Sequence, residues 1–299
     1  MIYSLHRFGA SFEEYFIYKF YNLNALGRSK FNTLKMQYGY CELVNGNNVR
    51  SLFEDKGACY NLFKDFYKRD FLKVNNADDI PQLKDFITKH PSFIFKPVFG
   101  HSGMGVKIYR KLTPDDHSIA ELMKQGENQF VVEELIEQVG NMAKMHPESI
   151  NTIRIATFTA NGKVNVLGSA LRMGTGKSNV DNAGAGGIYA GVDAKEGVVI
   201  SIARDNVGNT FLRHPDSQIV IPGFVIPEWD KLLTVTSQMA RTVTDATVIA
   251  WDLAYSSKGW VMVEGNDVGE QYLLQAPLQK GVKFQLQKHI DAFMLHDKN

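Results

Sequence analysis

The stretch TVIAWDLAYSSKGWVMVEGND at 247–267 predicts a β-hairpin that carries polar side chains on otherwise apolar strands. Two runs rich in β-branched and aromatic residues flank SSKG at 256–259, a tetrad typical of turns. Gly259 supplies the left-handed backbone that closes a three-residue hairpin loop. In that register Tyr255 faces Val261.

The same register brings three oxygen-bearing side chains of the hairpin together. Asp252 lies opposite Glu264, and strand alternation puts Met262, Glu264 and Asn266 on one face. Two carboxylates and a carboxamide are ligands that suit a hard divalent cation such as Mg²⁺. A solvated strand end with a polar turn is the alternative interpretation.

Composition indicates an ordinary globular chain that is large enough for two lobes. It has 299 residues, of which 44% are hydrophobic and 22% charged. The 33 Lys and Arg balance 32 Asp and Glu, so no overall field favours nucleic acid or an anionic membrane, and partners must be inferred from local sites. Two cysteines match neither zinc nor redox spacing. Because no signal peptide or membrane-spanning run is found, we expect a cytoplasmic protein without a transmembrane segment.

Apolar periodicity predicts an α+β chain that is helical at first and then rich in strands. Helical spacing predicts helices over 11–24, 51–68, 78–89, 228–244 and 282–295. Alternation predicts strands over 92–98, 105–111, 129–135, 152–160, 163–173, 187–193 and 198–203.

A glycine-rich turn follows a strand that ends in a lysine. In FIFKPVFGHSGMGVKIYRK at 93–111, Lys96 closes the first strand, and Gly100, Gly103 and Gly105 precede the second. Glycines let backbone N–H groups approach phosphate oxygens, and the lysine adds a positive charge. The pattern is neither a Walker A loop nor a dinucleotide motif, because a strand follows it. A plain turn is the alternative.

A second strand, FVVEELIE at 130–137, ends in Glu133 and Glu134. A strand end of this kind can offer backbone groups to an adenine and a carboxylate to ribose hydroxyls. A helix N-terminus that favours two glutamates is the alternative.

Taken in order, EDKGACYNLF, FIFKPVFGHSGMGV, FVVEEL, HPESINTIRI, ALRMG and the hairpin resemble the ATP-grasp superfamily over about residues 50 to 270. The resemblance is greatest to the sugar-transfer-associated branch and related α-L-glutamate ligases. It implies an ATP-grasp fold, in which two α+β subdomains grip ATP between antiparallel sheets. We expect an N-terminal subdomain with the flap at 51–134 and a C-terminal metal and substrate subdomain at 135–299. A helical segment, 1–50, replaces the full α/β domain that usually comes first.

The resemblance also implies a role for individual residues. The ATP phosphates are assigned to two lysines and the flap, namely Lys56, Lys96, Gly100, His101, Ser102, Gly103 and Gly105. Adenine and ribose are assigned to Glu133, Glu134 and the Leu135 backbone. One or two Mg²⁺, or Mn²⁺, are assigned to Asp252, Glu264 and Asn266. The catalytic cations are assigned as Arg154, Arg172 and Lys96.

The substrate candidates rest on weaker signals. Asn151 fits the pattern of the family, although shaping the turn before a strand is an equal explanation. Asn182, Gly186 and Gly187 lie in a Gly/Ala/Asn-rich stretch, which a flexible loop explains equally well.

These assignments imply an ATP-dependent carboxylate–amine ligase that works through an acyl phosphate and releases ADP and phosphate. We expect small-molecule substrates, with an amino acid joined to a carboxyl-bearing sugar or peptide-like acceptor in polysaccharide or secondary-metabolite synthesis. Functional association with glycosyltransferases is expected, no nucleic acid is involved, and a homo-oligomer is compatible with the sequence. Two alternatives stay open: a phosphotransferase with a hydroxyl acceptor, and a non-catalytic nucleotide-binding partner of a glycosyltransferase.

Overall fold

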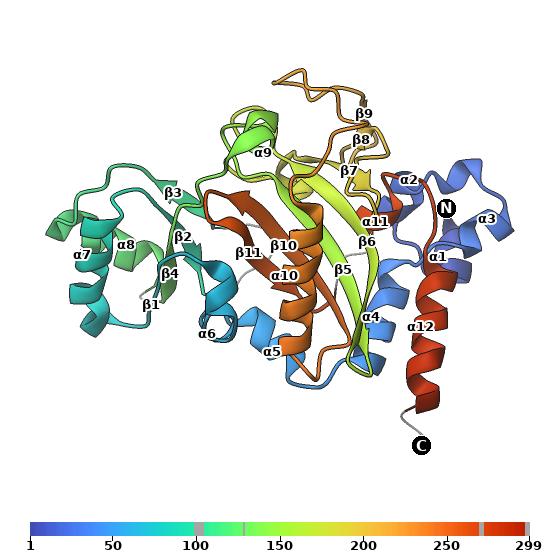
Figure 1. Ribbon diagram of the computed structural model, residues 1–299, viewed down its shortest axis with the longest axis horizontal. Coiled ribbons are helices and arrows are strands. Elements are labelled where there is room, and N and C mark those ends of the chain that lie inside the picture. Colours follow the sequence, from blue (N-terminus) through green and yellow to red (C-terminus); the bar gives the residue numbers. More distant parts are fainter. Residues whose placement is uncertain (99–104, 128, 269–271, 297–299) are drawn as a thin grey trace. The chain divides into compact units, whose positions relative to one another are not determined.

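Two antiparallel sheets organise the chain (Figure 1). The computed structural model describes residues 1–98, 105–127, 129–268 and 272–296. A large unit comprises Met1–Val49 and Gln138–Asn299, and a small unit comprises Arg50–Glu137. The functional division into 1–50, 51–134 and 135–299 remains a proposal. No helix in the described part of the chain is both long and apolar enough to cross a bilayer.

The small unit is a four-stranded sheet with two helices on one face. Its strand order is β1-β4-β2-β3, with bounds β1 (Phe71–Val74), β2 (Phe93–Pro97), β3 (Lys107–Tyr109) and β4 (Phe130–Glu134). Its helices are α5 (Val49–Glu54), which begins at the unit boundary, α6 (Lys56–Tyr67), η2 (Ala77–Asp79), α7 (Ile80–Lys89) and α8 (Asp116–Gln125). Apolar residues of α7 and α8 pack against Phe93, Phe95 and Phe130 in one core. Alternation therefore leaves Lys96 and Glu133 on the opposite face.

The large unit is built on a seven-stranded sheet of order β11-β10-β5-β6-β7-β8-β9. The strands are β5 (Thr152–Ala160), β6 (Lys163–Met173), β7 (Ile188–Val192), β8 (Ala203–Arg204), β9 (Thr210–Phe211), β10 (Val248–Ser256) and β11 (Gly259–Asn266). The helices are α1 (Ile2–Phe8), α2 (Phe12–Ile17), η1 (Phe20–Asn22), α3 (Ala25–Ser29), α4 (Leu34–Val44), α9 (Gly140–Met145), η3 (Ala183–Ala185), α10 (Trp229–Thr242), α11 (Tyr272–Gln275) and α12 (Lys283–His296).

The two faces of the large sheet are covered by different parts of the chain. Helix α10 packs on one face, where the Trp260 indole N–H donates to the Pro227 carbonyl at 3.1 Å. Helices α4 and α12 pack on the other face against Ala156 and Ala250. Alternation puts those two alanines on the same face as Arg154, two residues away along β5. The helical N-terminal segment therefore forms one core with the sheet face that carries the candidate residues.

Three predicted elements differ from the structure. The helix expected over 11–24 has its capping box at Ser11, but it ends at Ile17, and Lys19 takes a left-handed backbone (φ 50°). The helix expected over 51–68 is interrupted because the Asp55 side chain accepts from two backbone N–H groups and starts a new helix, α6. The strand expected over 198–203 reduces to Ala203–Arg204 and two isolated bridges, at Val198 and Val199.

Gln275 ties the N-terminal helices to the C-terminal part of the large unit. It is fully buried. Its Nε2 donates to the Asn32 carbonyl (2.8 Å) and the Tyr18 hydroxyl (3.1 Å), and its Oε1 accepts from the backbone N–H of Asn32 (2.9 Å) and Val282 (3.2 Å). Every polar position of this amide is therefore used.

We predict that Gln275→Leu lowers the free energy of unfolding of the large unit by about 2–4 kcal/mol, because the buried hydrogen bonds of Gln275 with the Asn32 N–H and carbonyl are lost. Urea unfolding followed by tryptophan fluorescence measures this loss, since all three tryptophans lie in the large unit. Gln285→Leu, at an exposed position of α12, is the matched control. Equal stability of the two variants would contradict the assignment.

Candidate functional site

The charged face of the small unit centres on Glu133. Arg69 donates to its Oε2 from Nε (2.8 Å) and Nη2 (2.6 Å), and Lys96 donates to Oε1 at 2.6 Å. Ile94 pairs with Glu133, so Lys96, two residues further along β2, lies on the same face. Burial alone raises the pKa of Glu133, but the Arg69 and Lys96 charges outweigh it and bring the pKa to about 2. Glu133 is therefore ionised and orients Lys96.

Two further lysines and one carboxylate lie beside this network. Lys73 belongs to the same face of the sheet and pairs with Asp55 at 3.0 Å. Lys56 follows that aspartate as the first residue of α6, and its Nζ donates to the Val98 carbonyl at 3.3 Å. Together with Arg69 and Lys96, these groups make four cations against two carboxylates, Asp55 and Glu133. This face of the small unit carries an excess of positive charge.

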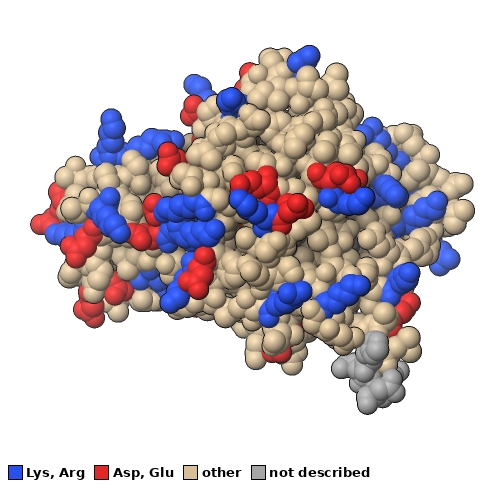
Figure 2. Space-filling model, in the orientation of Figure 1, with Lys and Arg blue, Asp and Glu red and all other residues tan. Residues whose placement is uncertain are grey.

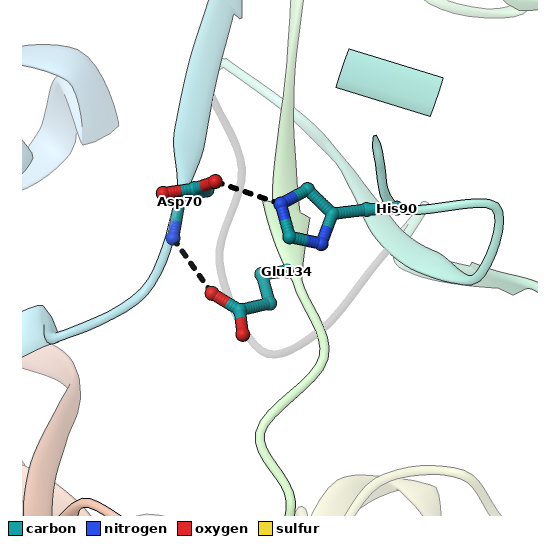
Figure 3. Close-up of side chains that lie close together, drawn as sticks. All are labelled: Asp70, His90 and Glu134. Atoms are coloured by element: carbon teal, nitrogen blue, oxygen red, sulfur yellow. Dashed lines mark hydrogen bonds and ion pairs between the residues drawn. The ribbon is translucent and has the colours of Figure 1, made fainter. Parts of the chain in front are cut away.

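Glu134 belongs to a separate cluster at the end of β4 (Figure 3). Its Oε2 accepts from the backbone N–H of Asp70 at 3.0 Å, and the Asp70 carboxylate contacts His90 Nε2 at 2.7 Å and Lys89 Nζ at 2.5 Å. Hydrogen bonds from Lys89 and His90 lower the pKa of Asp70. These contacts fix the exit of β4, whose next residue, Leu135, is half-buried. Adenine or ribose binding by this segment remains a proposal.

Most of the predicted flap lies outside the described residues, namely Gly100, His101, Ser102 and Gly103. Gly105 is described and has a left-handed backbone (φ 73°). A Cβ there would lie 2.7 Å from the Pro97 ring. Only glycine fits this position, where the chain folds back beside β2.

The large unit holds a buried ion network on β5, β6 and β10. Asp252 accepts from Arg154 (Nε 2.5 Å, Nη2 2.7 Å) and from Arg172 Nη1 (2.7 Å). Arg172 also donates to Asp181 at 2.9 Å, and Asp181 accepts from the backbone N–H and the hydroxyl of Thr152. Burial raises the pKa of Asp252, but the two guanidinium groups reverse the effect and lower it. Two cations and two anions balance here.

The hairpin loop that closes β10 and β11 is one residue shorter than predicted. Ser256 pairs with Gly259, which leaves a two-residue loop, and Gly259 has the expected left-handed backbone (φ 80°). Tyr255 therefore pairs with Trp260, and the predicted pairing with Val261 is wrong.

A β-bulge then restores the predicted pairing at the site. Leu253 pairs with Met262, whereas Asp252 pairs with Glu264, so Val263 is an extra residue. Asp252 and Glu264 share a face, as predicted. Simple alternation predicts Met262 on the same face as Glu264. This prediction is wrong, because the bulge puts Met262 on the opposite face. The bulge therefore places Glu264 on the sheet face that carries the ion network.

The three predicted metal ligands fit a divalent cation but differ in access. Glu264 is exposed beside Asp252, whereas both Asp252 oxygens already accept from arginines. Asn266 pairs with Ala250, which puts it on the face of Asp252, and its buried side-chain nitrogen has no hydrogen-bond partner among the described residues. Because an amide N–H is a donor and cannot ligate a cation, only the Glu264 carboxylate and the Asn266 amide oxygen offer the oxygen ligands that such an ion prefers. Metal binding by these three residues remains a proposal.

The substrate candidates of the Gly/Ala/Asn-rich stretch meet in one folded loop. The Asn182 side chain accepts from Gly184 N–H at 2.8 Å, and Gly186 has a left-handed backbone (φ 90°). A Cβ on Gly187 would lie 2.3 Å from the Asp181 carbonyl. The predicted positions therefore shape the loop that ends in β7. Substrate contact by them remains a prediction.

Asn151, the other substrate candidate, is fully buried. Its Nδ2 lies within hydrogen-bonding distance of Gln138 Oε1 (2.8 Å) and of the carbonyls of Met142 (2.9 Å) and His146 (3.2 Å). This geometry holds the turn before β5, and a role in substrate binding stays a prediction.

Two buried histidines contact the start of the loop that follows Arg172. The sequence did not predict that both would bind this loop. His214 Nε2 contacts the Gly174 carbonyl at 2.8 Å, and His146 Nε2 contacts the Gly176 carbonyl at 3.0 Å. His214 Nδ1 faces the backbone N–H groups of Asp216 and Ser217 and accepts from them, so His214 is neutral. Burial lowers its pKa, which favours the same state. The loop after Arg172 is therefore anchored from two sides.

Arg69 and Asp181 are the charged residues of these networks that the sequence did not reveal. Arg69 lies two residues before the start of β1, a four-residue strand that was not predicted. Recognising DFLKV at 70–74 as a strand would have supplied the signal, because its pairing with β4 brings Arg69 to Glu133. Asp181 carries no comparable local signal, since its partners are set by sheet pairing.

The chain has the two antiparallel sheets of an ATP-grasp fold. The sequence model described as sugar-transfer associated ATP-grasp matches residues 35–291, and the chain belongs to this family. No curated protein matches the sequence significantly.

Solved structures share the fold at low sequence identity. D-Ala:D-Ser ligase VanG from Enterococcus faecalis matches with a TM-score of 0.53 and 12% identity, covering 84% of this chain and 64% of that one. D-alanyl-alanine synthetase A from Vibrio cholerae matches with a TM-score of 0.51 and 13% identity, covering 84% and 68%. The ATP-grasp ligase PsnB, solved with a minimal precursor, matches with a TM-score of 0.50 and 13% identity, covering 83% and 63%. The chain thus spans about two thirds of the length of these proteins.

We predict that Glu133→Gln destabilises the small unit at neutral pH by on the order of 3 kcal/mol. The pKa of Glu133 is about 2 in the folded chain, against 4.5 for an unperturbed glutamate. The network therefore contributes its full stability above about pH 4.5, and this contribution is lost as the pH falls from 4.5 towards 2.

Hydrogen exchange of the β4 amides measures this effect within the small unit. The wild type is expected to lose protection across that acid range, and Glu133→Gln to show low protection with little further change. Asp85→Asn, at an exposed position of α7, is the control and should behave like the wild type. A variant with the acid response of the wild type would disprove the assignment.

Proposed function

We propose that this chain is an ATP-dependent carboxylate–amine ligase that consumes Mg·ATP and releases ADP and phosphate. The charged face of the small unit carries the proposal, because four cations surround two carboxylates there. Such an excess suits the binding of a triphosphate. Membership of an ATP-grasp family supports the same ligand. The proposed setting is the cytoplasm, where ATP is abundant.

In this proposal each group of cations has its own part in the reaction. Lys56 and Lys96 bind phosphate oxygens, and Glu133 keeps Lys96 oriented on its strand. Arg154 and Arg172 present N–H groups to the substrate carboxylate and the transferred phosphoryl group, and Asp252 holds both arginines in place. Positioning of anions by fixed cations is the main source of rate in phosphoryl transfer.

The proposed chemistry has two steps. A carboxylate oxygen attacks the γ-phosphorus, the bond to the β–γ bridging oxygen breaks, and ADP leaves. An amine then attacks the acyl carbon, loses a proton and displaces phosphate, so that an amide forms. Mg²⁺ held by Glu264, Asn266 and Asp252 would supply further neutralisation of the phosphate charge.

The acceptor proposed from the family is a carboxyl-bearing sugar or a peptide-like acid. The reaction joins an amino acid to it, in the synthesis of polysaccharides or secondary metabolites. Functional association with glycosyltransferases belongs to the same proposal. The alternatives are phosphoryl transfer to a hydroxyl and nucleotide binding without catalysis. The experiments below separate these three.

We predict that Glu264→Gln weakens Mg²⁺-dependent ATP binding by at least about tenfold without a change in thermal stability, because its side chain is exposed. Asp252→Asn is expected to weaken binding and also to destabilise the large unit by about 3–5 kcal/mol, because two buried arginines lose their common partner.

Calorimetric titration with Mg·ATP, combined with thermal unfolding, measures both effects. Glu196→Gln, an exposed position of the same unit, is the control. Unchanged Mg·ATP binding by Glu264→Gln would remove this residue from the metal set.

We predict that ADP release requires a carboxylate and an amine together. The measurement is an ADP-release screen of amino acids crossed with uronic acids in free, nucleotide-linked and lipid-linked forms. ADP release with a hydroxyl acceptor and no amine would favour the phosphotransferase. Tight Mg·ATP binding without ADP release, whichever pair of amine and carboxylate is supplied, would favour the non-catalytic role.

A further inference from the structure

Each of the first two helices of the large unit buries a polar residue and exposes large apolar ones. In α1, Ser4 is fully buried, whereas Ile2 is 71% exposed. In α2, Glu14 is 6% exposed, whereas Phe12 is 62% exposed. An amphipathic helix that faces water on its outer side has the reverse pattern. The outer faces of both helices are therefore suited to an apolar medium.

The buried polar groups have structural functions that explain their inward position. Glu14 accepts from the backbone N–H of Ser11 (2.9 Å) and of Leu34 (2.6 Å), so one carboxylate caps the starts of two helices, α2 and α4. Ser4 accepts from Arg28 Nη1 at 3.1 Å. The outward apolar side chains stay largely exposed to water, which lowers solubility.

These side chains form one surface, which we call the N-terminal apolar patch. It consists of Ile2, Tyr3, Leu5, Phe12, Phe16 and Tyr21, which are 47–71% exposed. Ring contacts join its later members, since Phe16 lies 4.9 Å from Phe12 and 6.2 Å from Tyr21 between ring centroids. Tyr3 contacts the buried Phe8 at 5.9 Å.

The segment that carries this patch is rich in cationic side chains. Residues 1–35 contain five Lys and Arg against two Glu, and one of those glutamates, Glu14, is buried. Figure 2 shows Lys and Arg among uncharged side chains over α1 to α3, with Asp and Glu sparse there. The whole chain has a net charge of only +1, so this charge is local.

We propose that the N-terminal apolar patch binds the surface of an anionic lipid bilayer. Exposed Phe, Tyr and aliphatic side chains enter the boundary between headgroups and acyl chains, while Arg7, Lys30 and Lys35 contact lipid phosphates. Positive charge around the patch disfavours a second copy of this chain, since two like-charged rims would meet. The proposal does not depend on the reaction that the chain catalyses.

Co-sedimentation of the full chain with vesicles tests the proposal. Vesicles of phosphatidylcholine and phosphatidylglycerol in equal parts are expected to bind the chain, and pure phosphatidylcholine vesicles to bind it much more weakly. Added salt should reduce binding. Phe12→Ser with Phe16→Ser should reduce the partition coefficient at least about tenfold, and Lys30→Gln with Lys35→Gln should reduce it roughly tenfold.

The matched control is Val207→Ser with Leu212→Ser, which removes two exposed apolar side chains of the same unit (84% and 60% exposed) away from the patch. It should bind like the wild type. The proposal is overturned by an absence of binding to anionic vesicles, or by equal loss in the control. It is also overturned if the phenylalanine variant binds vesicles normally but loses a concentration-dependent dimer, which would assign the patch to self-association.

Discussion

The Asp252 carboxylate and its two arginines are the contact on which the large unit depends. A buried carboxylate without partners costs several kcal/mol, and the same is true of each guanidinium. Arg154 lies directly opposite Asp252 on the neighbouring strand, and Arg172 reaches it from β6. The pairing is satisfied in only one register of β5, β6 and β10, because a slip by one residue would turn each charge to the other face. The network therefore specifies the sheet as well as the site.

The sequence predicted this region well at the level of elements and less well at the level of pairing. Both strands of the hairpin, the pairing of Asp252 with Glu264 and the left-handed Gly259 are as expected. The loop length was wrong by one residue, and the bulge at Val263 compensated for that error. Turn composition favours a short loop but does not fix its length, and a bulge leaves no signal in simple alternation.

Long-range partners could not be predicted from local patterns. Lys96 and Glu133 were each selected, but for separate contacts, and the structure shows them bound to each other. Arg69 was missed with the short strand β1, and Asp181 depends on how β5 and β6 pair. A motif identifies residue types at a site, whereas the charge balance of that site depends on which strands are neighbours.

The ion network of the large unit and the charged face of the small unit differ in net charge, a difference that their sequence motifs do not reveal. The large-unit network is neutral, with two arginines against two aspartates, so it can stay buried at little electrostatic cost and leaves Glu264 as the exposed anion. The small-unit face brings four cations to two carboxylates, Asp55 and Glu133. Such a composition suits a multiply charged anionic ligand. A similar argument applies to the apolar side chains of the N-terminal helices. Exposed Phe12 and Phe16 are unfavourable in water, and an apolar medium that covers them makes their position favourable.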